Sequence, residues 1–207
     1  MTDVLIFDLD NTLYSRERDL FSLIDRRINL YMSDVLGIAK EAVDGLRRRY
    51  WSDYGVTLGG LIRHHGVDPE DYLDYVHDVD IAARLGQDPQ LLQALVASPL
   101  RKVVFTNASS EYARRVLACL GVEACFDGIF DIRIASFLPK PYPEPYRKVL
   151  DRLGVAGERC VMVEDTLKNL KTAKELGMET VWVGPEGETP PFVDHRVASA
   201  AQVPAIY

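Results

Sequence analysis

Residues 4–14 read VLIFDLDNTLY, in which four apolar residues precede two aspartates separated by a single leucine. An apolar run of this length is typical of a parallel strand that is buried on both faces. A charged carboxylate at the end of such a strand loses several kcal/mol of solvation unless a cation or hydrogen bonds compensate it. We therefore expect a compensating group close to Asp8 and Asp10.

The composition is that of a folded protein. The chain has 207 residues, 47% of them hydrophobic and 27% charged, which is enough for one large core and a smaller inserted domain. Its formal net charge of -7 argues against a nucleic-acid-binding surface. The sequence has neither a run of about 18 apolar residues nor a basic leader before the first apolar run. We expect a cytoplasmic protein without a nucleic-acid or membrane partner.

Two further apolar runs also end at a polar pair. They are VVF at 103–105, followed by TN, and VMV at 161–163, followed by ED. Weaker strand candidates are 129–135 and 180–183, and the proline-rich stretch 184–204 is interpreted as an extended terminal segment. The strong runs have the form expected of the inner strands of a parallel sheet.

Segments with the period of an α-helix lie between these runs, and a glycine follows each one: 112–120 before Gly121, 146–153 before Gly154, and 167–176 before Gly177. Glycine just past a periodic segment is a common helix C-cap. Strands therefore alternate with helices, which predicts an α/β fold with a doubly wound, Rossmann-like parallel sheet.

The stretch from 15 to 98 interrupts this alternation. It contains no convincing strand but several amphipathic segments, the clearest of which carries apolar residues from Leu20 to Val35 on one face. An insertion of roughly 80 residues is much longer than an ordinary crossover connection. We therefore expect a Rossmann-like core formed by 1–14 and 99–207, with an inserted all-helical cap domain over 15–98.

Polar residues follow the predicted strands at their carboxyl ends, which is the edge of an open parallel sheet where ligands bind. The candidates are, in chain order, Asp8, Asp10, Thr106, Asn107, Lys140, Glu164 and Asp165. Lys140 is flanked by prolines in the loop after the weak strand at 129–135. The set combines four carboxylates, one ammonium group and two neutral side chains that can form hydrogen bonds.

These residue types suit phosphoryl transfer. Mg²⁺ takes one or two carboxylates together with water and phosphate oxygens, and Asp8 with Asp165 would satisfy it. With its charge screened by the metal, Asp8 could attack phosphorus and form an aspartyl-phosphate. Asp10 could protonate the leaving oxygen and then activate water. The candidates for holding the phosphate oxygens are Thr106, Asn107 and Lys140.

The motif DLDNT at 8–12, followed in order by Thr106, Lys140 and the pair Glu164-Asp165, resembles the haloacid dehalogenase (HAD) superfamily of phosphohydrolases. The resemblance covers nearly the whole chain. It implies that Asp8 is the nucleophile and that Asp10 is the acid/base. It also implies that Thr106 and Lys140 act on the phosphate.

The same resemblance implies a Mg²⁺ site. Its ligands would be Asp8, Asp165 and the backbone carbonyl of Asp10, with Glu164 as a direct or neighbouring ligand. The helical insertion after the first motif resembles the mobile cap of that family, which closes over the substrate and excludes water.

A narrower similarity concerns the substrate. FDLDNTLY at 7–14, with Tyr54-Gly55 and LIRHH at 61–65, is similar to the pyrimidine 5'-nucleotidase branch. This similarity implies a pyrimidine nucleoside monophosphate, UMP or CMP, as substrate. The substrate-binding candidates in the cap are Tyr54, Arg63 and His64. Trp51 and Trp182 are interpreted as packing residues.

Several other functions stay open on the sequence. A phosphatase or phosphomutase of sugar phosphates would use the same core residues. A signalling module shares the phosphoacceptor Asp, but in that class the acidic pair precedes the acceptor. A haloacid dehalogenase proper does not need Asp10, and an idle binding module would be expected to have lost one of the core residues. We predict a Mg²⁺-dependent phosphomonoester hydrolase with a small-molecule substrate; the oligomeric state is open.

Overall fold

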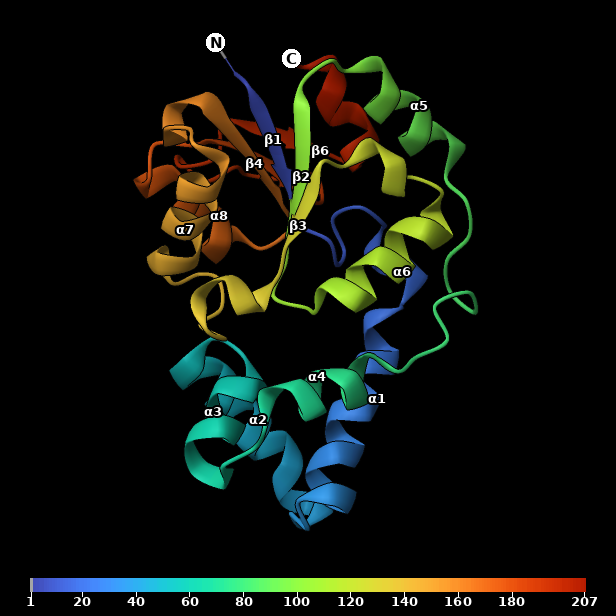
Figure 1. The fold of residues 1–207 in the computed structure, drawn as a ribbon, viewed down its shortest axis with the longest axis vertical. Coiled ribbons are helices and arrows are strands. Elements are labelled where there is room, and N and C mark those ends of the chain that lie inside the picture. Colours follow the sequence, from blue (N-terminus) through green and yellow to red (C-terminus); the bar gives the residue numbers. More distant parts are fainter. Residues whose placement is uncertain (1) are drawn as a thin grey trace.

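The computed structural model describes residues 2–207. A parallel sheet flanked by helices forms one part of the molecule. A separate group of helices lies beyond one end of the strands (Figure 1). The described ends of the chain lie at the opposite end of the sheet from this helical group. Ligands of parallel sheets bind at the carboxyl ends of the strands, which here face the helical group.

Within residues 2–207 the sheet has six strands, all paired in parallel: β1 (Val4–Phe7), β2 (Arg101–Phe105), β3 (Gly128–Phe130), β4 (Cys160–Glu164), β5 (Glu179–Val183) and β6 (His195–Val197). Their order in space is β3-β2-β1-β4-β5-β6. The strand before the DLDNT motif is therefore central and pairs with β2 and β4. The ends of these three strands, and the polar residues that follow them, lie side by side.

Both faces of β1 are buried, as its unbroken apolar run predicts. The helices that flank the sheet include α6 (Ser110–Leu120), α7 (Pro143–Leu153) and α8 (Leu167–Glu175). Leu5 and Phe7 pack in the hydrophobic cluster that contains residues of α6, whereas Val4 and Ile6 pack in the cluster that contains residues of α7 and α8. The predicted doubly wound α/β fold is confirmed.

The glycines predicted to end these helices do so. Gly121 follows α6 with a φ of 75°, and Gly154 follows α7 with a φ of 70°; both N–H groups donate to carbonyls of the last helical turn. α8 ends at Glu175, and Gly177 follows two residues later with a φ of 84°. Only glycine adopts these left-handed conformations without steric cost.

The helical group beyond the sheet comprises α1 (Phe21–Leu30), α2 (Lys40–Tyr54), α3 (Thr57–His65) and α4 (Pro69–His77). We call these four helices the helical cap. The amphipathic segment predicted from Leu20 to Val35 is α1, continued by a π-helical turn, η2 (Tyr31–Val35). A short 3-10 helix, η1 (Arg16–Arg18), connects β1 to the cap. Among residues 2–207, no helix is long and apolar enough to cross a membrane.

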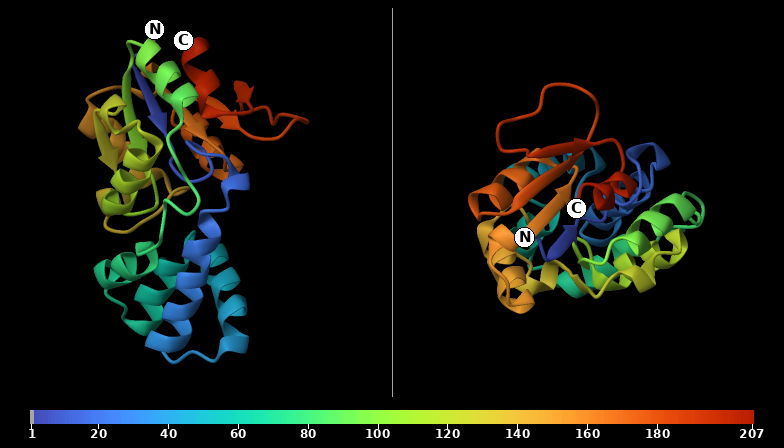
Figure 2. Two further views of the ribbon diagram at one scale, coloured as in Figure 1. Left: turned by 90° about the vertical axis from the view of Figure 1, so that its right-hand side faces the viewer. Right: turned by 90° about the horizontal axis from the view of Figure 1, so that it is seen from above.

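The last helix of the predicted cap segment, α5 (Pro89–Ala97), lies elsewhere. It packs against η6 (Ala200–Ala205), a 3-10 helix near the C-terminus, and both sit beside the sheet (Figures 1 and 2). Leu91 and Leu95 of α5 are buried in the hydrophobic cluster that also contains Ala200 and Val203. The helical cap therefore ends with α4, before the boundary expected at residue 98.

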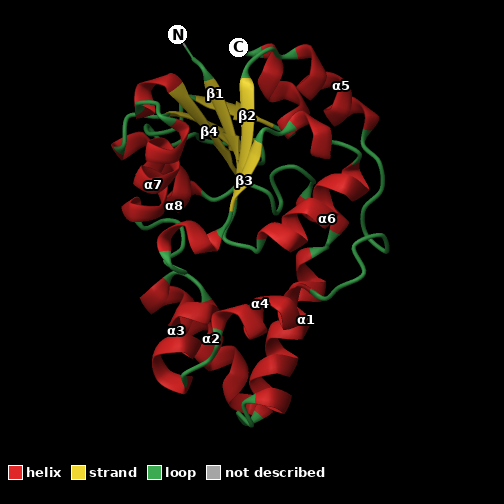
Figure 3. Cartoon of the chain, viewed as in Figure 1, coloured by secondary structure: helices red, strands yellow, loops and turns green. Residues whose placement is uncertain are grey.

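Two weaker predictions need correction. The stretch 129–135 is mostly not a strand: β3 stops at Phe130, and η4 (Ile132–Ala135) follows as a 3-10 helix that the Asp131 side chain caps. The stretch 184–204 is not simply extended, because it contains β6, labelled in Figure 1, and most of η6. Figure 3 distinguishes the helices, strands and loops by colour. The remaining short 3-10 helices are η3 (Glu123–Cys125) and η5 (Gly157–Arg159).

Candidate active site

A cavity of about 370 Å³ lies between the carboxyl ends of the strands and the helical cap. The sheet side contributes all seven polar residues predicted from the strand ends: Asp8, Asp10, Thr106, Asn107, Lys140, Glu164 and Asp165. The cap contributes mainly apolar side chains, including Ile24, Ile28, Leu58, Leu73 and Val76. The cavity thus has a charged floor and a largely apolar roof.

Lys140 connects three of the strand ends. Its Nζ donates to Asp8 Oδ1 at 2.7 Å, to Glu164 Oε2 at 2.8 Å and to the carbonyl of Phe105 at 2.8 Å. Its side chain is 1% exposed. Burial disfavours the charge of Lys140, but the carboxylates of Asp8 and Glu164 more than offset this and raise its pKa. Lys140 is therefore a fixed cation at the floor of the cavity.

The carboxylate of Asp8 is held at both oxygens. Besides the contact with Lys140, its Oδ2 accepts a hydrogen bond from Thr12 Oγ1 at 2.9 Å. Thr12 belongs to the DLDNT motif and follows Asp8 by one helical-type turn, so the motif itself supplies this donor. The two contacts fix the orientation of the carboxylate at the edge of the sheet.

The floor carries more negative charge than Lys140 neutralises. Asp8, Glu164 and Asp165 each offer a carboxylate oxygen, and these oxygens lie within 4.8 Å of one another. Burial and the neighbouring Asp8 raise the pKa of Glu164 to about 8. Burial also raises the pKa of Asp8, against the opposing effect of Lys140. Hard oxygen ligands with an excess of negative charge fit a bound Mg²⁺ ion.

Asp10 is not part of this carboxylate group. Its Oδ1 accepts hydrogen bonds from the hydroxyls of Tyr14, at 2.5 Å, and Tyr112, at 2.9 Å. Among residues 2–207, its Oδ2 has no hydrogen-bond partner. Burial raises the pKa of Asp10 to about 6, while the two phenols act in the opposite direction. The Asp10 side chain therefore lies among phenol hydroxyls and outside the group formed by Asp8, Glu164 and Asp165.

Thr106 and Asn107 line the cavity, but Asn107 has a further role. Its side-chain amide donates to the carbonyl of Lys140 at 3.1 Å and accepts from the N–H of Lys140 at 2.8 Å. Asn107 therefore fixes the backbone of the Lys140 loop. Thr106 Oγ1 accepts from the N–H of Ala108 at 3.0 Å. Among the residues that the structure describes, its hydroxyl hydrogen has no acceptor and could be donated to a ligand.

The substrate-binding candidates predicted in the cap do not line the cavity. Tyr54 and His64 bond to each other, with 2.8 Å between the Tyr54 hydroxyl and His64 Nε2, and Arg63 is exposed. From α3 only residues near its start, Thr57 and Leu58, reach the cavity. Substrate contact by Tyr54, Arg63 and His64 therefore has no support from the lining of the cavity and stays a prediction.

Other cavity residues were not predicted. Arg16 Nη2 lies 2.9 Å from Asp165 Oδ2. Trp51 lines the cavity and is 53% exposed, with Lys168 Nζ 4.6 Å from the centre of its ring, so it is not a packing residue. Trp182, in contrast, is partly buried and donates to the carbonyl of Asp165 at 3.0 Å. Arg47 also lines the cavity, but nothing in the local sequence distinguishes it from the arginines beside it.

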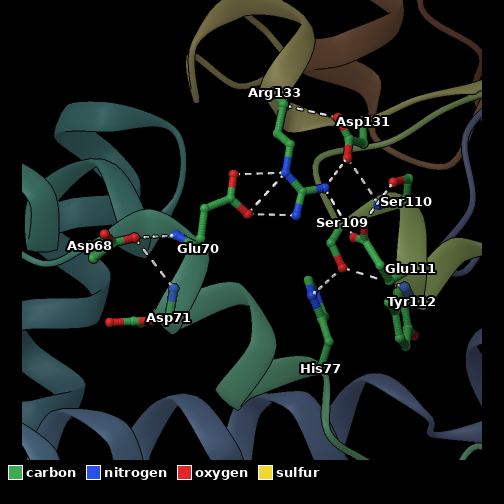
Figure 4. A network of polar contacts seen from close by, with 10 residues as sticks. All are labelled: Asp68, Glu70, Asp71, His77, Ser109, Ser110, Glu111, Tyr112, Asp131 and Arg133. Carbon is green, nitrogen blue, oxygen red and sulfur yellow. Dashed lines mark hydrogen bonds and ion pairs between the residues drawn. The ribbon is translucent and has the colours of Figure 1, made fainter.

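Polar contacts beside the cavity connect the cap to the core (Figure 4). Arg133, in η4, donates to both carboxylate oxygens of Glu70, in α4, at 2.6–3.0 Å. Glu111 and Asp131 bind the same guanidinium from the sheet side. Closer to the cavity, His77 Nδ1 of α4 lies 3.0 Å from the hydroxyl of Ser109. These contacts keep the cavity closed on the α4 side.

Comparisons with known proteins agree with this arrangement. A sequence model of the haloacid dehalogenase-like hydrolases matches residues 2–177. The phosphoglycolate phosphatase of Rhodospirillum rubrum is 31% identical over 201 residues, which cover 87% of this chain and 79% of that protein. Phosphate metabolism protein 8 of Saccharomyces cerevisiae is 27% identical over 192 residues, which cover 84% of this chain and 59% of the yeast protein.

The fold comparison gives the same picture. The HAD phosphatase from Thermococcus onnurineus has a TM-score of 0.66 to this chain at 22% identity, over 100% of this chain and 97% of that chain. Fold and site define a hydrolase with a Rossmann-like core. The chain belongs to the haloacid dehalogenase-like hydrolases, and it is an enzyme of the HAD phosphatase type.

Proposed function

We propose that the protein is a Mg²⁺-dependent phosphomonoester hydrolase that works through an aspartyl-phosphate on Asp8. The observation that carries the proposal is the buried contact of Lys140 with both Asp8 and Glu164, at 2.7 and 2.8 Å. It sets a nucleophilic carboxylate beside a fixed ammonium group that can hold a phosphate oxygen. Asp165 and Glu164 complete a group of oxygen ligands next to the same carboxylate.

Asp8 and Asp165, with the backbone carbonyl of Asp10, would hold the metal ion. Glu164 is better suited to a supporting role, because Lys140, Asn169 and the N–H of Thr166 already bind its two oxygens. When bound, Mg²⁺ would neutralise phosphate charge and so reduce its repulsion of Asp8.

The protein groups divide the reaction into two steps. In the first, an oxygen of Asp8 bonds to phosphorus while the bond from phosphorus to the ester oxygen breaks, and Asp10 gives its proton to the departing oxygen. In the second, water attacks phosphorus and Asp10 accepts a proton from it. The bond from phosphorus to Asp8 breaks, and phosphate leaves. Throughout, Lys140 and Thr106 would hold oxygens of the phosphoryl group.

For the substrate we propose a pyrimidine nucleoside monophosphate. The cavity volume of about 370 Å³ is within the range for small-molecule sites. Its apolar cap wall suits a base better than it suits a small charged leaving group. In addition, the buried Nε of Arg47 has no hydrogen-bond partner among residues 2–207, and a ring carbonyl could accept from it. Phosphoglycolate, named for one relative, and sugar phosphates are the competing substrates.

A phosphate-release assay tests both parts of the proposal. UMP, CMP, AMP, ribose 5-phosphate and phosphoglycolate are each supplied with Mg²⁺ or with EDTA, and the Asp8→Asn variant is the blank. We expect metal-dependent release that is fastest from UMP or CMP. If release were fastest from ribose 5-phosphate or phosphoglycolate, the proposed pyrimidine nucleotide substrate would be wrong, but the proposed mechanism would still hold. Release that persists in EDTA would refute the metal dependence.

A phosphomutase of sugar phosphates would use the same side chains. The two functions differ in what accepts the phosphoryl group from Asp8. Transfer in ¹⁸O-labelled water separates them, since hydrolysis places one labelled oxygen in each phosphate released. Formation of an isomeric sugar phosphate without label would show a mutase.

A further inference from the structure

Exposed aromatic side chains gather at the cavity. Seven large hydrophobic residues are exposed among residues 2–207, and two of them, Phe21 and Trp51, line the cavity. Phe21 begins α1 and is 40% exposed, and Trp51 lies near the end of α2 and is 53% exposed. An indole left this open forgoes a large burial energy, so a function at the cavity is a reasonable explanation for it.

The neighbours of Trp51 place it close to the reacting groups. Lys168 Nζ lies over its ring, 4.6 Å from the centre, and Lys168 follows Asp165 by three residues at the start of α8. The end of α2 also touches the Lys140 loop, because a Cβ on Gly55 would lie 3.1 Å from Pro139 Cγ. Trp51 therefore lies on a side of the cap that contacts the core, against α8, three residues from Asp165 through Lys168.

The cations that line the cavity with Trp51 suit an anionic ligand. Lys168 and Arg16 both line the cavity, and the Arg16 side chain is 76% exposed. Lys168 beside the open indole combines attraction for a phosphate with a flat surface for a ring, whereas Arg16 pairs with Asp165. A substrate that carries both a phosphate and a planar group would use both features.

We propose that the base of the substrate stacks on the indole of Trp51. Trp51 would then set the preference of the enzyme for nucleotides over simple sugar phosphates. This inference rests on the proposed function and adds a specificity-determining residue to it. Lys168 covers one face of the ring, and the exposed remainder of the side chain receives the base. Stacking of a base on an aromatic side chain typically contributes a ten- to hundredfold effect, about 1–3 kcal/mol.

The test compares a substrate with a base and one in which a hydroxyl replaces the base at C1 of the ribose. UMP and ribose 5-phosphate are assayed with the wild type, Trp51→Leu and Trp51→Phe. We expect Trp51→Leu to lower kcat/KM for UMP by roughly ten- to hundredfold and for ribose 5-phosphate by less than about twofold. Trp51→Phe keeps an aromatic face and should retain most of the selectivity. Val96→Ala, at an exposed site on α5 away from the cavity, controls for surface truncation.

The alternative role for Trp51 is a purely structural contact with Lys168 that closes the cap. In that case Trp51→Leu would lower kcat/KM for both substrates by the same factor, and the proposal would be wrong. A wild type that prefers AMP or an aryl phosphate, with that preference lost in Trp51→Leu, would contradict the pyrimidine substrate but support stacking. A wild type without any preference for planar leaving groups would overturn the stacking proposal and leave the phosphatase chemistry untouched.

Binding gives a readout that is independent of turnover. Trp51 and Trp182 are the two tryptophans of the chain. In an Asp8→Asn background, UMP should change the tryptophan fluorescence, and ribose 5-phosphate should have a much smaller effect. The change should disappear in Asp8→Asn/Trp51→Phe, where only Trp182 emits. An equal change in both backgrounds would show that UMP does not stack on Trp51.

Discussion

Lys140 Nζ lies 2.7 Å from Asp8 Oδ1, although 132 residues separate them in the chain. The same nitrogen bonds Glu164, so one ammonium group ties the β1 and β4 ends to the loop that follows η4. All three side chains are at most 10% exposed. The ion pairs are therefore both part of the fold and part of the site, and the two roles can be separated by mutation.

Lys140→Met should destabilise the protein strongly. It removes the cation from between buried carboxylates and leaves their charges uncompensated, at a cost of about 3–5 kcal/mol in the free energy of unfolding. Urea denaturation at neutral pH measures this change. Lys140→Met/Glu164→Gln removes one of the stranded charges as well and should recover part of the loss. If the double variant were no more stable than the single one, charge compensation would not be the reason for the destabilisation.

Asp8→Asn should abolish activity without lowering stability. The amide keeps the shape of the carboxylate and removes one negative charge from a group that has too many, so the melting temperature should not fall. Loss of the nucleophile should reduce kcat by roughly 10⁴-fold or more. Phosphate release and thermal unfolding of the same preparation measure the two effects. Residual activity within about tenfold of the wild type would exclude Asp8 as nucleophile.

The residues on the floor of the cavity were predictable because their signal is local. A buried strand followed by polar residues is visible in the sequence, and parallel pairing brings the ends of β1, β2 and β4 to one edge. That is why Asp8, Thr106 and Asp165 were expected to lie together. Knowing the fold class was enough to predict that these residues lie at the same edge of the sheet.

The roof of the cavity was not predictable in the same way. An amphipathic helix shows which of its faces is buried, but not what it is buried against. For this reason the sequence predicts α5 as part of the cap, although the helix packs on η6. Trp51 was interpreted as packing and is exposed at the cavity, whereas Tyr54 and His64 contact each other. These outcomes depend on how the cap docks on the sheet, which no short stretch of sequence specifies.

Asp165→Asn should weaken the response to Mg²⁺. The substitution keeps the size of the side chain but removes a charge from the proposed ligand set, so more Mg²⁺ would be needed for half-maximal activity, by roughly ten- to hundredfold. Titration of activity with Mg²⁺ after EDTA treatment measures the shift. Asp194→Asn is a suitable control, because that carboxylate pairs with Lys174 and neither residue lines the cavity. Superimposable titrations of wild type and Asp165→Asn would remove Asp165 from the ligand set.

The buried His77 should make the free energy of unfolding depend on pH. Burial, together with Arg115 and Arg133, lowers its pKa from 6.5 to about 4, although Glu111 acts in the opposite direction. Between these values the unfolded chain binds a proton that the folded protein does not, so the free energy of unfolding falls as the pH drops from 6.5 to 4, by up to about 3 kcal/mol from this group. His77→Gln removes this contribution and should flatten the curve measured by urea denaturation in that window, relative to wild type and to the exposed-site control His64→Gln. Parallel curves for all three proteins would show that His77 does not carry the pH dependence.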